Sequence, residues 1–68
     1  MKITLNNRPE TIPEMEEMTV SELLDYKTFT FKFLVIRING KTIKKEEYDS
    51  ATIREGDDVK VIHLISGG

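Results

Sequence analysis

The chain has 68 residues, with 10 Lys or Arg, 12 Asp or Glu and a net charge of −2. A chain of this length forms one domain and buries only about 60% of the surface that it exposes when unfolded. It contains no cysteine, which excludes disulfides, thiolate metal sites and cysteine nucleophiles. The small negative charge gives no reason to expect nucleic-acid binding.

The sequence also lacks the segments that place a protein in a membrane or direct it through one. It has no apolar run of about 20 residues and no basic start followed by an apolar stretch. We therefore expect a cytoplasmic protein with no membrane contact.

The N-terminal residues predict a β-hairpin. Residues 1–6 alternate apolar and polar side chains, as expected of a strand with one buried face. Residues 6–9 have turn chemistry, because Asn tolerates left-handed backbone and Pro interrupts a strand ladder. Residues 10–12 then form the expected return strand, which Pro13 closes.

The clearest local signal is a helix start at Thr19. Thr19 and Glu22 fit a capping box, in which each side chain accepts a hydrogen bond from the backbone N–H of the other residue. Met18 and Leu23 occupy the two positions of a hydrophobic staple. Apolar side chains then recur at helical spacing, which predicts a short helix that ends near residue 26 or 27 and packs on a sheet.

The middle of the chain predicts a central strand and a hairpin. Residues 33–38 are almost continuously apolar, which indicates a strand covered on both faces. Asn39-Gly40 is the strongest short hairpin signal, with residues 41–43 as the partner strand. By parity, Phe29, Phe31 and Phe33 share a face with Val35 and Arg37, whereas Leu34, Ile36 and Ile38 lie on the other face. Either a bulge shifts the register, or these early phenylalanines belong to a loop that packs separately.

The remaining residues predict a connector and a last strand. Residues 44–50 are polar apart from Tyr48, so we expect a helical turn or loop held by that aromatic. Residues 51–53 return to the core, residues 54–58 form a turn that contains a glycine, and residues 59–64 form the final strand. The order of elements predicts an α+β fold, a β-grasp (ubiquitin-like) roll. It has a mixed sheet of four to five strands, central and parallel first and last strands, and one main helix on one face.

We expect this domain to span residues 1–64, followed by a flexible tail at residues 65–68 that ends in Gly67 and Gly68. Glycine lacks Cβ, so such an end is thin, and an extended tail would reach roughly 13 Å. Its α-carboxylate is ionised at neutral pH and needs activation by another enzyme before it reacts as an electrophile. The alternative is a frayed terminus made of small residues.

The body of the chain shows no catalytic constellation. His63 is the one histidine and has no partner at a recognisable spacing, so we expect it at the edge of the core. Asp57 and Asp58 fit a turn better than a metal site. We therefore expect a substrate or binding module for other proteins, not an enzyme, with no metal and no cofactor of its own.

The final strand also predicts a docking patch at the root of the tail. If Val59 and Val61 point inward, the residues that alternate with them along the strand point outward beside a neighbouring strand, where apolar side chains bordered by charge favour protein docking. The residues expected in this patch are Val35, Arg37, Lys60, Ile62, Leu64 and Ile65. The alternative is that Phe29 and Phe31 cover this face within the monomer.

Several motifs then occur in one order and spacing along nearly the whole chain. They are the opening residues 1–3, the helix start 19–24, the strand and turn 35–40, Tyr48, the turn 55–59, and Gly67-Gly68 as the end. In this arrangement the chain resembles the ThiS family of ubiquitin-like sulfur carriers of thiamin biosynthesis. Lys44-Lys45 and Tyr48 depart from the residues that are frequent in that family.

The resemblance implies a mechanism centred on Gly68. A ThiF-like adenylating enzyme of the ubiquitin-activating type would use ATP to convert the Gly68 carboxylate to an acyl-adenylate. Sulfur from a partner's persulfide would replace AMP, and the resulting thiocarboxylate would supply a ThiG-like thiazole synthase. Gly67 would keep the tail narrow, while ATP and the sulfur donor would belong to the partners. The alternatives are a MoaD-like carrier for molybdopterin or another sulfur pathway, and a ubiquitin-like protein modifier or interaction module.

Overall fold

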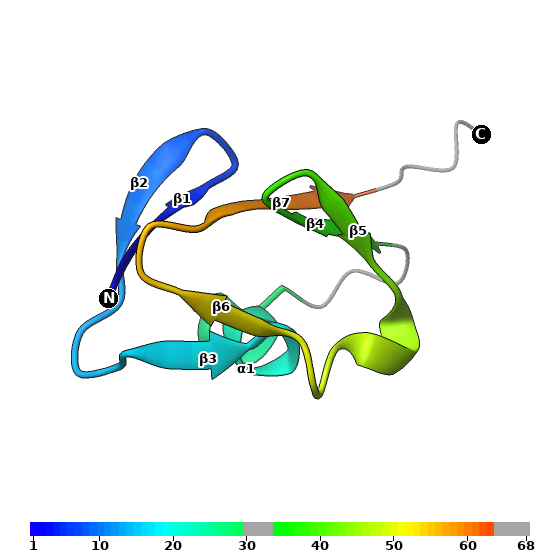
Figure 1. The fold of residues 1–68 in the computed structure, drawn as a ribbon, viewed down its shortest axis with the longest axis horizontal. Helices are drawn as coiled ribbons and strands as arrows, with labels where there is room; N and C mark the ends of the chain where they lie inside the picture. Colours follow the sequence, from blue (N-terminus) through cyan, green and yellow to red (C-terminus); the bar gives the residue numbers. More distant parts are fainter. Residues whose placement is uncertain (30–33, 64–68) are drawn as a thin grey trace.

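The computed structural model of the chain describes residues 1–29 and 34–63. These residues form a five-stranded sheet in the order β2-β1-β7-β4-β5, a two-stranded sheet of β3 and β6, and helix α1 (Figure 1). The elements are β1 (Lys2–Leu5), β2 (Arg8–Thr11), β3 (Glu17–Thr19), α1 (Val20–Tyr26), β4 (Leu34–Ile38), β5 (Lys41–Ile43), the 3-10 helix η1 (Lys45–Glu47), β6 (Thr52–Arg54) and β7 (Asp58–His63).

The sheet has the predicted β-grasp arrangement. Strands β1 and β7, which come first and last in the chain, lie side by side and parallel, with Thr4 opposite Asp58 and Leu5 opposite Val59. Strand β7 is the middle strand, and its other neighbour, β4, runs antiparallel to it. The mixed sheet with one helix on one face confirms the predicted fold class.

The first hairpin turns more tightly than predicted. Asn6 and Asn7 both have positive φ, at 52° and 68°, and together make the whole turn. Arg8 and Pro9, predicted to belong to the turn, lie in β2 instead. Pro9 is tolerated there because β2 is the edge strand of the sheet, where a missing N–H need not serve a second neighbour.

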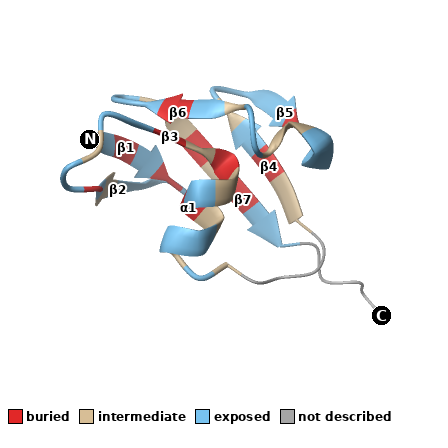
Figure 2. Cartoon of the chain, turned by 90° about the horizontal axis from the view of Figure 1, so that it is seen from below, coloured by how far each residue is buried: buried red, intermediate tan, exposed pale blue. Residues whose placement is uncertain are grey.

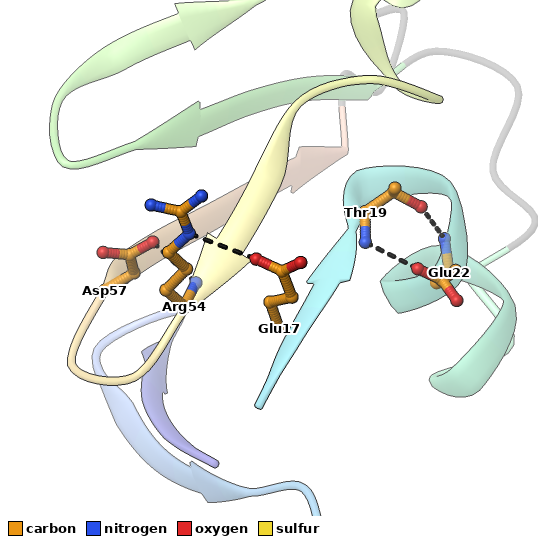
Figure 3. Close-up of polar contacts among 5 residues, drawn as sticks. All are labelled: Glu17, Thr19, Glu22, Arg54 and Asp57. Atoms are coloured by element: carbon orange, nitrogen blue, oxygen red, sulfur yellow. Dashed lines mark hydrogen bonds and ion pairs between the residues drawn. The ribbon is translucent and has the colours of Figure 1, made fainter. Parts of the chain in front are cut away.

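Helix α1 starts and ends as predicted. The Glu22 backbone N–H donates to Thr19 Oγ1 at 3.1 Å, and the Thr19 N–H donates to Glu22 Oε1 at 2.8 Å (Figure 3). Met18 and Leu23, the two staple residues, are both buried. The helix ends at Tyr26, and Lys27 caps it with an N–H···O bond of 3.0 Å to the Leu23 carbonyl.

The sequence did not predict the small second sheet. Strand β3 pairs antiparallel with β6, with Glu17 opposite Arg54 and Met18 opposite Ile53. Arg54 Nε donates to Glu17 Oε2 at 3.3 Å across this pair (Figure 3). Arg54, predicted in the turn that precedes the last strand, therefore lies in β6.

The question of the early phenylalanines is resolved for Phe29, which lies before β4 in a loop. It packs against the buried core, and its N–H donates to the Leu24 carbonyl at 2.8 Å. Phe31 lies outside the described residues. The Asn39-Gly40 turn has positive φ at both residues, 51° and 84°, as the hairpin signal predicts.

One apolar core joins the helix to the inner face of the five-stranded sheet (Figure 2). Its buried members are Ile3, Leu5, Ile12, Met18, Val20, Leu23, Ile36, Ile43, Ile53, Val59 and Val61. Tyr48 follows η1 and packs on this core, so the polar connector is held by its aromatic residue as predicted.

Candidate functional site

The candidate site is the outer face of the sheet, which we define as the surface of β4 and β7 opposite helix α1 that carries Val35, Arg37, Lys60 and Ile62. Side chains alternate across a strand. In β7, Val59 and Val61 are buried, so Lys60 and Ile62, which alternate with them along the strand, face outward. The antiparallel register places Arg37 opposite Lys60 and Val35 opposite Ile62. The four side chains therefore form a block of two adjacent pairs.

The apolar pair lies nearer the end of β7. Ile62 remains 38% exposed and Val35 is half-buried. A large aliphatic side chain left open on a sheet face can transfer from water to an apolar partner surface, which is favourable. This pair is therefore the apolar part of the candidate site, and a docking role for it stays a prediction.

The basic pair lies one step back along the strands. Lys60 Nζ is 3.2 Å from Asn7 Oδ1 and 3.6 Å from Asp58 Oδ2. Arg37 is exposed and has no ion pair within residues 1–29 and 34–63. A guanidinium in this position can donate two hydrogen bonds to a carboxylate of a partner. The face thus combines an apolar end with a basic end.

The β1–β2 turn is hydrogen-bonded to β7, one of the two strands that carry this face. The Val61 N–H donates to Asn6 Oδ1 at 2.8 Å, and the Asn6 N–H donates to the Val59 carbonyl at 2.9 Å. Sequence reasoning used Asn6 and Asn7 as turn residues and missed this second role. The available signal was the pair of asparagines at a sharp turn, because Asn both tolerates positive φ and has a side chain that bonds to nearby backbone.

Four of the predicted site residues, Leu64, Ile65, Gly67 and Gly68, lie outside the described residues. The predicted boundary between the domain and the tail lies there as well. The roles of these four residues and the position of the boundary therefore stay predictions. Phe29, which sequence reasoning offered as a cover for the outer face, packs against the core instead.

Two other polar residues considered from the sequence, His63 and Asp57, lie at the end of a strand and in a turn. His63 ends β7 opposite Leu34 and is exposed, not set into the edge of the core as predicted. Asp57 lies in the turn before β7, where its carboxylate accepts hydrogen bonds from Asn39 and the Arg54 N–H. Across residues 1–29 and 34–63, His, Asp and Glu form no group of three that could hold a metal ion. No helix in the same residues has the length and apolarity to cross a membrane.

Comparison with known proteins agrees with this fold. The model of the ThiS family matches residues 3–68. The chain belongs to the ThiS family. No curated protein matches the chain.

Two solved structures of a thiamine biosynthesis protein from Geobacter metallireducens, one crystal and one solution structure, are similar over the whole of this chain. A crystal structure described as thiamine biosynthesis protein (ThiS) has a TM-score of 0.90 and 29% sequence identity, and the match covers 100% of both chains. A solution structure described as a thiamine biosynthesis protein has a TM-score of 0.81 and 29% identity, and the match covers 88% of that chain. The ThiS match extends through β7 to residue 68, so it includes the predicted tail as well as the described domain.

Proposed function

We propose that this chain is a sulfur carrier in thiamin biosynthesis and that Gly68 is its C-terminal, sulfur-bearing residue. The observation that carries the proposal is the ThiS family match over residues 3–68, which spans the β-grasp domain and Gly67-Gly68 together. The similarity to a thiamine biosynthesis protein of TM-score 0.90 supports the same assignment. The chain itself is a cosubstrate and not an enzyme.

The proposed chemistry takes place at the Gly68 carboxylate. A carboxylate oxygen attacks the α-phosphorus of ATP in a ThiF-like adenylating enzyme, releasing pyrophosphate and forming an acyl-adenylate. The terminal sulfur of a persulfide on a partner attacks the acyl carbon and displaces AMP. A partner thiol then cleaves the S–S bond of the resulting acyl disulfide, which releases the Gly68 thiocarboxylate and leaves a disulfide on the partner side.

The thiocarboxylate sulfur is nucleophilic and is the form that a ThiG-like thiazole synthase would consume. Gly67 and Gly68 suit passage into an enclosed active site, because residues without Cβ make the narrowest peptide chain. ATP, the persulfide and the thiol all belong to the partners. The chain binds no cofactor in this scheme.

The outer face of the sheet gives the docking step a physical basis. Ile62 and Val35 would bury apolar surface against the adenylating enzyme, while Arg37 and Lys60 would face its carboxylates. Leu64 and Ile65 would continue this contact toward the tail. Docking at this root would direct Gly68 to a fixed point, which favours reaction by removing orientational freedom.

The test is an intact-mass measurement after incubation with the ThiF-like enzyme, ATP and a sulfur donor. We expect a gain of about 16 Da at Gly68, because sulfur replaces oxygen. A variant that lacks Gly67 and Gly68 should show no gain, although it retains residues 1–66. Adducts to lysines would instead indicate a protein modifier, and transfer to molybdopterin synthesis but not to thiazole would favour the MoaD-like alternative.

A second experiment tests the docking face. Ile62→Ala and Arg37→Ala should weaken binding to the adenylating enzyme, whereas Glu16→Ala, at an exposed residue before β3, should not. Charge reversal in Arg37→Glu should slow association most at low salt, because exposed charges are screened beyond about 10 Å at 0.1 M salt. Unchanged binding in all three face variants would contradict the docking role.

A further inference from the structure

A hollow of about 460 Å³ lies on the helix side of the molecule. It is lined by Met15, which lies two residues before β3, by Met18 of β3, and by Glu22, Asp25 and Tyr26 of helix α1. Strand β3 and helix α1 form the layer below the five-stranded sheet in Figure 1. The outer face defined above therefore points away from this hollow.

The floor and walls of the hollow are apolar. Met18 is buried and forms part of the core, Met15 is half-buried, and Tyr26 is 49% exposed. Methionine side chains are flexible and polarizable and adapt to ligands of different shape. An open tyrosine offers a large apolar ring at little entropic cost, which is why tyrosine is common in protein interfaces.

The rim of the hollow is acidic. Glu22 and Asp25 lie one helical turn apart on α1, and both are exposed. Glu22 Oε1 accepts the Thr19 N–H, but the Asp25 carboxylate has no ion pair or hydrogen bond within the described part of the chain. Lys27, the nearest cation along the helix, is paired with Glu10 at 3.1 Å. Within residues 1–29 and 34–63, no Lys or Arg side chain forms an ion pair with either carboxylate of the rim.

We propose that this hollow is a second docking site, which binds a partner-protein segment with an aliphatic side chain flanked by Lys or Arg. The aliphatic group enters between Met15 and Tyr26, and the flanking cations meet Glu22 and Asp25. Charge complementarity selects this occupant over an acidic or neutral one. Because the site lies on the opposite side from the outer face, a partner can occupy it while the outer face is engaged.

The experiment is a two-dimensional ¹H–¹⁵N NMR titration of the full chain. The probe is a capped peptide with two central leucines and two basic residues on either side, and the matched control peptide carries acidic residues in their place. We expect the basic peptide to shift the amides of the five lining residues. The shifts should decrease severalfold at about 0.5 M salt, because the Debye length falls to a few Å.

Two variants test the assignment. Tyr26→Ser should abolish the shifts by removing one wall, and Asp25→Lys should reverse the preference so that the acidic peptide binds better. Both positions are exposed, and a dispersed spectrum shows that each variant folds. Ile62→Ala, on the outer face, is the control and should bind the basic peptide like the parent protein.

The proposal stands independently of sulfur transfer. It is overturned if both peptides give equal shifts, if the shifts map to Lys60 and Ile62, or if the Tyr26 and Asp25 variants bind unchanged. Shifts that depend on protein concentration without peptide would also overturn it, because they would assign the hollow to a second copy of this chain.

Discussion

The side chains of Asn39 and Asp57 join two turns that are distant in sequence. Asn39 Nδ2 donates to Asp57 Oδ1 at 3.0 Å, and Asn39 Oδ1 accepts the Asp58 N–H at 2.9 Å. Asp57 Oδ2 also accepts the Arg54 N–H at 2.9 Å. The β4–β5 turn is thereby fixed to the turn before β7, which sets the register of the two strands that carry the outer face.

Asp57→Ala should therefore destabilise the fold. The substitution leaves Asn39 Nδ2 and the Arg54 N–H without their acceptor, and each lost bond to a charged group costs about 1.5–3 kcal/mol before compensation by water. Because the site is exposed, we expect a loss of about 1–3 kcal/mol in total, measured by urea unfolding. Glu16→Ala, at an exposed carboxylate without a hydrogen bond in residues 1–29 or 34–63, should change stability by less than about 0.5 kcal/mol. Equal effects in the two variants would contradict the role of the Asn39–Asp57 contact.

The features that were predicted correctly from the sequence have causes that act within a few residues. The capping box of Thr19 and Glu22 spans one helical turn, and the Asn39-Gly40 turn depends on the backbone preferences of those two residues. The inward and outward sides of β7 follow from alternation. For the candidate site, alternation indicated that Lys60 and Ile62 face outward.

The features that were missed depend on contacts between distant segments. Strands β3 and β6 have three residues each, too few for a visible period, and they become strands by pairing with each other across the chain. The position of Pro9 in β2 depends on that strand's being at the edge of the sheet. The register that sets Arg37 opposite Lys60 likewise requires the assembled sheet.

Thr19→Ala should destabilise the protein by about 1 kcal/mol through loss of the N-cap acceptor of helix α1. Thr19→Ser retains the hydroxyl and serves as the matched control, which should remain within about 0.5 kcal/mol of the parent protein. Thermal and urea unfolding both measure the difference. If the serine variant lost as much stability as the alanine variant, the packing of the threonine methyl group would be the cause and not the cap.

Because the phenol of Tyr48 is partly buried, we expect its ionisation to destabilise the folded protein at alkaline pH. Burial disfavours the charged phenolate, so it raises the pKa of Tyr48 above its usual value. The folded state holds the proton more tightly than the unfolded state. The resulting stabilisation is complete below the unfolded pKa of about 10 and is lost as pH rises through the folded pKa. Tyr48→Phe cannot ionise and should lack this component of the alkaline loss.

The check on Tyr48 is the free energy of unfolding across a pH series that brackets about 10, in the parent protein and in Tyr48→Phe. The two curves should run parallel at neutral pH and diverge at alkaline pH, where the parent protein loses more stability. Tyr26→Phe, at an exposed tyrosine, is the matched control and should follow the parent protein. Parallel curves for the Tyr48 variant would show that burial of its phenol does not contribute.

Ile36 and Ile62 separate the role of the core from that of the outer face. Ile36 lies on β4, is completely buried and faces helix α1, whereas Ile62 lies on β7 and is 38% exposed on the opposite face. Ile36→Ala should cost about 2–5 kcal/mol, because it removes buried atoms and leaves a cavity. Ile62→Ala should cost less than about 1 kcal/mol, since much of its side chain already contacts water.

For binding to the adenylating enzyme, we expect the substitution at Ile62 to have a larger effect than the substitution at Ile36. Ile62→Ala removes apolar surface from the proposed interface and should weaken the complex with the adenylating enzyme by about tenfold, equivalent to 1.4 kcal/mol. Ile36→Val, a smaller change in the core, should keep normal affinity while losing about 0.5–1.5 kcal/mol of stability. Isothermal titration calorimetry, performed where each variant is folded, measures the affinities. Normal binding by Ile62→Ala together with weakened binding by Ile36→Val would contradict this prediction. The affinity would then depend on the stability of the domain and not on contacts with its outer face.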